Sequence, residues 1–339
     1  MIPNQMLTGF IRETAEISGA KISCYDKNDK LIFRAGDCDD EKEYSFEIAV
    51  DGKKIYTLNV SGGENPHLTG KMASAHVKNL YEAYEEKLDK KSYFQNLILD
   101  NMLEVDIFNK AKKLHINPED KRCVFVIEPI GKRNDNMLRI VQELFYAQAG
   151  DQVIEVDESR IIVIKSLDDE SEIKETAEML VDMAGSEAMQ SVRVAYGNVA
   201  DDLKKISKSY REAMLSLEVG NIFYIEKSII AYNSLGIGRL IYQLPVNLCQ
   251  LYVKEIFGED IPEDIDDEML NTINKFFDNN LNVSETSRQL SMHRNTLLYR
   301  IDKVQKVTGL DIRIFDDALA LKIALMVVNY MKYIENKED

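Results

Sequence analysis

The chain has 339 residues, which at about 100–200 residues per domain predicts two or three globular domains. Because 45% of the residues are hydrophobic and 29% are charged, the chain has enough apolar surface for real cores, and wholesale disorder is excluded. The formal net charge of -16 argues against a globally basic protein that coats nucleic acid, and leaves room only for a confined basic surface.

Residues 1–69 predict a small antiparallel sheet flanked by helices. A helical pattern over residues 6–17 precedes a hairpin whose apolar strands flank the turn Lys27-Asn28-Asp29-Lys30. A second hairpin, over residues 43–60, has Asp51-Gly52 at the left-handed positions of a two-residue loop. An effector pocket is one interpretation of these strands and a plain sheet core is the other. The candidates for lining a pocket are Tyr25, Arg34, Tyr44, Phe46 and Tyr56.

Residues 70–103 predict one long helix. The segment has no Pro and no internal Gly, and its apolar residues recur at helical spacing between charged ones. Two roles are open for such a helix: it joins domains and pairs with a second copy of itself, or it packs on its own subunit.

Residues 104–258 interleave strands and helices, which predicts an α+β or α/β sandwich with one mostly antiparallel sheet. The apolar run at 122–130 starts the sheet, and the acidic linker 258–268 ends this part of the chain. The other expected elements are a helix at 137–149, a hairpin at 153–165, a helix at 173–184, a strand at 191–197, and helical stretches at 200–219 and 235–257.

Residues 259–339 are helical almost to the end. The helices expected at 283–290 and 293–307 are separated only by Ser291-Met292, which predicts a helix-turn-helix. In this arrangement Ser287 is the small residue at the helix crossing, and Met292 fills the turn. The residues at i, i+4 and i+7 of the second helix, Leu297, Ile301 and Val304, are expected to form its buried face.

The opposite face of that second helix is expected to point outward, with Asn295, Tyr299, Asp302 and Lys306 along it and Arg294 at its entrance. Arg can pair with guanine and Asn with adenine in the major groove, whereas Arg288, Arg300 and Lys303 suit phosphates. Residues 281–313 carry a local excess of +3, while the rest of the chain sums to -19. The pattern therefore predicts a cationic surface for double-stranded DNA.

The run SRQLSMHRNTLLYRIDKVQKVTGLDIRIFDDALALKIAL at 287–325 closely resembles the C-terminal helix-turn-helix of the PucR/CdaR group of bacterial transcriptional regulators. Two departures, Thr286-Ser287 for paired alanines and Ser291 for glycine, keep the residues small. The alternative is an ordinary helical subdomain in which HRNT merely caps a helix. The resemblance implies DNA-facing roles for His293, Arg294, Asn295, Thr296, Tyr299 and Arg300.

The middle of the chain resembles the GGDEF-like domain of the same group, which implies a ferredoxin-like sandwich. A diguanylate cyclase needs a Gly-Gly turn and adjacent carboxylates that hold Mg²⁺. The corresponding hairpin reads Val156-Asp157-Glu158-Ser159-Arg160, without either glycine. Asp157 and Glu158 are therefore expected to be solvated turn residues, and no catalytic residue is expected. A nucleotide-signalling enzyme and a signalling scaffold that does not bind DNA are the alternative functions.

The expected fold is a multidomain α+β protein with a PAS- or GAF-like sensor, a ferredoxin-like α/β sandwich and an all-α helix-turn-helix domain. Its expected partners are DNA, a second copy of the chain and a small-molecule effector. No metal is expected, because Cys24, Cys38, Cys123 and Cys249 are scattered without C-x-x-C spacing, and no cofactor is expected either. No segment reads as a membrane span or a signal peptide, which predicts a cytoplasmic protein.

Overall fold

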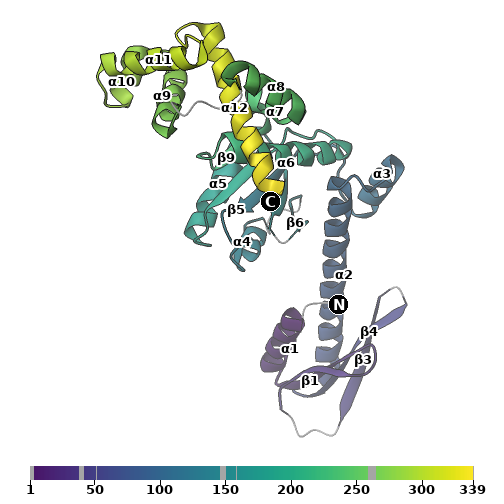
Figure 1. The fold of residues 1–339 in the computed structure, drawn as a ribbon. Coiled ribbons are helices and arrows are strands. Elements are labelled where there is room, and N and C mark those ends of the chain that lie inside the picture. Colours follow the sequence, from purple (N-terminus) through teal and green to yellow (C-terminus); the bar gives the residue numbers. More distant parts are fainter. Residues whose placement is uncertain are drawn as a thin grey trace. The chain divides into compact units, whose positions relative to one another are not determined.

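The computed structural model describes residues 4–37, 42–50, 52–145, 150–157, 159–258 and 265–338, and Figure 1 shows its fold. The chain divides into two compact units, Met1–Pro118 and Glu119–Asp339. The predictions for Cys38, Asp51, Glu158, the end of the helix at 146–149 and the linker at 259–264 fall on residues outside those described.

The first unit contains a four-stranded sheet with the order β2-β1-β4-β3, in which all neighbours are antiparallel. Both predicted hairpins are confirmed, and Asp29 takes the left-handed conformation, φ 61°, in the first turn. The elements of this unit are α1 (Asn4–Ser18), β1 (Ala20–Asp26), β2 (Leu31–Ala35), β3 (Glu43–Val50), β4 (Lys53–Gly62), α2 (Pro66–Ile98) and α3 (Glu104–Lys113).

Helices α1 and α2 pack on the apolar face of this sheet. Leu7 of α1, Leu58 of β4 and Val77 of α2 are fully buried in one cluster. Helix α2 passes so close to the sheet that a Cβ atom on Gly70 would lie 2.0 Å from the Phe46 ring, so only glycine fits there.

The long helix α2 differs at both ends from the predicted 70–103. It starts earlier because Asn65 caps it, its Oδ1 accepting a hydrogen bond from the Leu68 N–H at 3.1 Å. It stops at Ile98, and Asp100 in the left-handed conformation, φ 60°, turns the chain toward α3.

The second unit contains a five-stranded sheet with the order β6-β7-β5-β8-β9, and the predicted mostly antiparallel pairing is confirmed. The exception is β9, three residues that were not predicted and that pair in parallel with β8. The elements are β5 (Arg122–Pro129), α4 (Met137–Leu144), β6 (Gln152–Glu155), β7 (Ile161–Ser166), α5 (Glu172–Ser186), β8 (Val192–Tyr196), α6 (Ile206–Phe223) and β9 (Ile229–Ala231).

Helices cover both faces of this sheet, which explains why β5 is apolar at consecutive positions instead of alternating. Phe125 points into a core shared with Met137 of α4 and Leu180 of α5. On the other face α6 lies against β5 and β8, and the Ser209 hydroxyl accepts a hydrogen bond from the Val124 N–H at 3.2 Å.

Among the described residues of the second unit, six α-helices follow β9. The predicted helical stretch at 235–257 is two helices, because Pro245 has no N–H to continue the first one. Among the residues described, no helix is both long and apolar enough to cross a membrane. The helices are α7 (Gly236–Tyr242), α8 (Val246–Phe257), α9 (Asp267–Asp278), α10 (Val283–Gln289), α11 (Arg294–Thr308) and α12 (Phe315–Glu338).

Candidate nucleic-acid interface

Helices α10 and α11 form the predicted helix-turn-helix, and local signals define their ends. The Asn282 side chain caps α10 by accepting hydrogen bonds from the N–H groups of Ser284 at 3.0 Å and Glu285 at 3.1 Å. His293 caps α11, its Nδ1 accepting from the Asn295 N–H at 3.2 Å. Between them Ser291 adopts the left-handed conformation, φ 52°, which closes the turn.

The buried face of α11 consists of the residues that were predicted to form it. Leu297, Ile301 and Val304 are all at most 2% exposed, and they pack in one core with Phe276 of α9 and Leu321 of α12. This core holds α11 in a single rotation about its axis, and so determines which side chains point outward.

The prediction that Ser287 is the residue of α10 at the helix crossing is wrong. Thr286 is fully buried, whereas Ser287 is only half-buried and its hydroxyl donates to the Ser284 carbonyl oxygen at 2.9 Å. The side of α10 that meets α9 and α11 is the one that carries Thr286. Met292 packs against the core, as predicted for the turn.

The outer face of α11 is polar at its N-terminal end. His293, Arg294, Asn295 and Thr296 are exposed, and Tyr299 is 70% exposed one turn later. These are the residue types that hydrogen-bond to base edges and phosphates, and the first turn of such a helix is the part that reaches the major groove. Lys303 is half-buried on the flank.

Arg288 is exposed on α10 but is already paired. Its Nη2 donates to Glu285 Oε1 at 2.6 Å, and this hydrogen bond raises the pKa of Arg288 and lowers that of Glu285. A phosphate that contacts Arg288 must therefore compete with a neighbouring carboxylate.

Arg300 does not point outward with the other candidates. Its Nη1 donates to the Thr272 hydroxyl at 2.8 Å, and its Nη2 forms a short ion pair with Glu268, both on α9. The two contacts join α11 to a helix about 30 residues earlier in the sequence, so the sequence pattern contained no signal for them.

We expect Arg300→Gln to lower the melting temperature slightly without changing the salt dependence of DNA binding, because the lost contacts are within the protein. A phosphate contact would instead reduce the slope of log Kd against log salt by about 1. Thermal denaturation and binding titrations at several salt concentrations measure both effects. A reduced slope with an unchanged melting temperature would instead indicate that Arg300 contacts a DNA phosphate.

Arg313, in the turn after α11, neutralises acidic groups near the outer face. Its guanidinium donates to Asp302 Oδ1 at 2.9 Å, to Asp311 Oδ1 at 2.6 Å and to Gln305 Oε1 at 2.9 Å. The hydrogen bond from Arg313 lowers the pKa of Asp311. Asp302, which the helical pattern placed outward, thus presents a paired carboxylate to an incoming phosphate.

The five candidates for an effector pocket lie on different sides of the first sheet. Tyr44 and Phe46 contact His67 of α2, with ring centroids 5.6 Å and 5.7 Å from that of His67, and Tyr56 is buried beneath the same helix at 1% exposure. By register Tyr25 and Arg34 belong to the other, polar face, where Arg34 Nε donates to the Ser23 hydroxyl at 3.0 Å. The sheet-core interpretation therefore suits Tyr44, Phe46 and Tyr56.

The hairpin that replaces the GGDEF turn is held by its own hydrogen bonds. Asp157 Oδ1 accepts from the Ser159 N–H and the Arg160 N–H, each at 2.8 Å. Nearby, the two oxygens of Glu128 accept from Arg160 Nε and from Asn221 Nδ2, each at 2.9 Å. Both of these carboxylates are thus engaged by protein groups.

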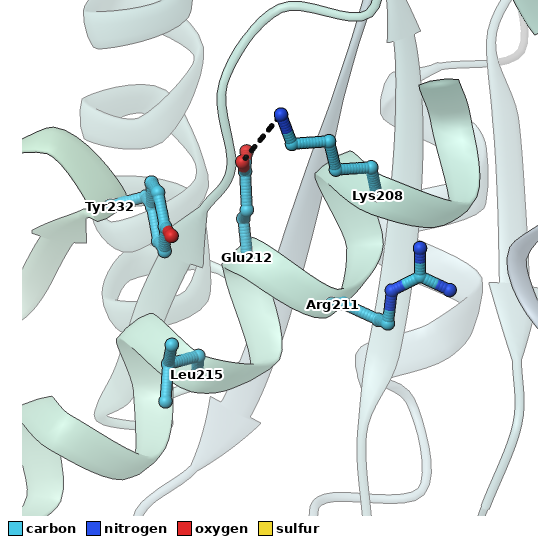
Figure 2. Close-up of a pocket in the computed structure, with 5 residues that line it drawn as sticks. All are labelled: Lys208, Arg211, Glu212, Leu215 and Tyr232. Atoms are coloured by element: carbon cyan, nitrogen blue, oxygen red, sulfur yellow. Dashed lines mark ion pairs between the residues drawn. The ribbon is translucent and has the colours of Figure 1, made fainter. Parts of the chain in front are cut away.

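Figure 2 shows a shallow hollow of about 220 Å³ beside α6 and the short 3-10 helix η2 (Tyr232–Ser234). Lys208 points toward Glu212, with its Nζ 3.8 Å from Glu212 Oε1, whereas Arg211 extends away from that pair. The other Glu212 oxygen accepts from the Asn198 N–H at 2.9 Å. Because both oxygens already have partners, the hollow adds no reactive carboxylate.

Comparisons with known proteins agree with this arrangement. The family model for the PucR C-terminal helix-turn-helix domain matches residues 269–327, and the model for the GGDEF-like domain matches residues 100–219. The chain thus combines a GGDEF-like domain with a helix-turn-helix domain. Both are domains of the PucR/CdaR group of bacterial transcriptional regulators, and the relatives of the chain include regulators of that group.

Several curated relatives are similar to the chain in sequence. The chain is 24% identical over 170 residues to the purine catabolism regulatory protein of Bacillus subtilis, covering 49% of this chain but only 32% of the relative. It is 24% identical over 300 residues to the carbohydrate diacid regulator of Escherichia coli, covering 83% and 78% of the two chains. It is 22% identical over 307 residues to the proline-responsive transcriptional activator PutR of Bacillus subtilis, covering 86% and 69%.

Proposed function

We propose that this chain is a sequence-specific transcriptional regulator that reads the major groove of DNA with the first turns of α11. The observation that carries the proposal is the exposure of Arg294, Asn295 and Tyr299 on one side of a helix whose other side is fully buried. Phosphate contacts from Arg288 and Lys303 would set the register of the helix, and the α11 residues would discriminate bases.

The first unit is proposed to receive the regulatory signal. Two helices on one face of an antiparallel sheet support a PAS- or GAF-like sensor. Of the five pocket candidates, Tyr25 and Arg34 lie on the other face of the sheet. In the second unit the element order β5-α4-β6-β7-α5-β8 supports a ferredoxin-like sandwich. The name of the proline-responsive relative supports a small-molecule effector for this chain as well.

The proposal that the GGDEF-like domain is not an enzyme is supported by the engaged carboxylates of Asp157 and Glu128. It is also supported by the names of the relatives, which describe regulators.

Selection of genomic DNA fragments by the purified chain tests the function. We expect a small set of sequences to be retained, with an affinity that falls as salt rises because phosphate contacts release counterions. Retention that is equally strong for all sequences, or that is insensitive to salt, would contradict the proposal.

A further inference from the structure

We propose that the helix pair α7–α8 is the surface through which two copies of this chain form a two-fold dimer. Figure 1 shows the two helices beside α12. The dimer is a property of the free protein, and only its consequence for DNA rests on the proposed function.

The exposed side of α7–α8 carries large apolar side chains and no charge from Leu240 to Leu251, and the exposed charges of α8, Lys254 and Glu255, lie at its C-terminal end. From Leu240 to Leu251 twelve consecutive residues lack a charged side chain, in a chain of which 29% is charged. Leu248 and Leu251 lie one turn apart and are 48% and 64% exposed, and Leu240 and Val246 are 60% and 42% exposed. Depletion of charge around large apolar side chains distinguishes the core of a protein interface from ordinary surface.

Charge identifies the occupant as a second copy. Each chain carries a formal net charge of -16, so two copies repel each other wherever acidic surfaces meet. A two-fold contact places the same patch on both sides, and an uncharged apolar patch is complementary to itself. The long helix α2 is the rival surface, but seven of the ten residues from Glu82 to Lys91 are charged around Leu88.

The inner side of α7–α8 is joined to the helix-turn-helix. The Tyr252 hydroxyl donates to the Ala320 carbonyl oxygen at 3.1 Å, and the Tyr330 hydroxyl donates to the Tyr242 carbonyl oxygen at 2.9 Å. Both contacts hold α12, whose first half packs against α11 in the helix-turn-helix core. Pairing through α7–α8 would therefore set the separation of the two α11 helices, as a reader of paired half-sites requires.

Sedimentation equilibrium of the full chain without DNA tests the interface. We expect the wild-type chain to have the mass of two chains, and Leu248→Glu/Leu251→Glu to have the mass of one, because like charges would meet across the axis. Leu88→Glu, which adds one negative charge at a 41% exposed leucine of α2, should remain a dimer. Asn247→Arg/Gln250→Arg should also dissociate it, and removes no apolar group.

Three results would overturn the proposal: a monomeric wild-type chain, a dimeric Leu248→Glu/Leu251→Glu variant with native circular dichroism, or dissociation by Leu88→Glu. The last would place the interface on α2. Because the mass is measured without DNA, these results are independent of the fragment selection. If both proposals hold, the monomeric variants should bind a single half-site but lose cooperative binding to paired half-sites.

Discussion

Replacing Arg294 and Asn295 together by alanine should abolish sequence selection while leaving the protein folded. Both side chains are exposed at the start of α11, and each bidentate contact with a base contributes about 1–3 kcal/mol of discrimination. The double variant should therefore lose about 30-fold or more in affinity for a selected fragment, relative to its affinity for random DNA. Competition gel shifts at fixed salt measure that ratio.

Arg139→Ala is the matched control for this variant, because it removes an exposed arginine from α4 of the same unit. It should leave the specificity ratio unchanged. If Arg294→Ala/Asn295→Ala retained the wild-type ratio, the assignment of α11 as the reading helix would be wrong, even if the chain bound DNA by another surface.

Phe276→Ala should strongly destabilise the helix-turn-helix. The Phe276 side chain is fully buried in the core that also contains Leu297 and Ile301 of α11. Loss of a buried phenylalanine costs about 3–5 kcal/mol, because apolar contacts are lost and a cavity is left. In a unit of this size we expect the melting temperature to fall by about 6–20 °C. DNA binding should be lost at temperatures where the wild-type chain still binds.

Phe315→Ala provides the comparison, because it removes the same ring from the start of α12, where 69% of the side chain is exposed. Its effect should be within about 0.5 kcal/mol. Equal melting temperatures for the two variants, followed by circular dichroism, would show that Phe276 is not the packing centre of the helix-turn-helix.

The helix-turn-helix could be predicted because its information is local. The Ser291-Met292 gap separates the two helices, and the spacing of Leu297, Ile301 and Val304 defines the buried side of α11. The hairpins of both sheets could be predicted for the same reason, because the alternation of apolar and polar residues and the turn residues lie within a few positions of each other. Strand β9 was not predicted, because three residues are too few to show the alternation of apolar and polar residues that marks a strand.

Side-chain partners distant in the sequence were decided only by the tertiary structure. The pairing of Arg300 with Glu268, the burial of Thr286 in place of Ser287, and the engagement of Asp302 by Arg313 all depend on how helices pack. The sequence by itself determined which helix could read DNA and which of its sides is apolar, because helical periodicity is a property of the backbone. Packing decided which of its cations remain available to DNA, because each charge pairs with the nearest group in space, whatever its place in the chain.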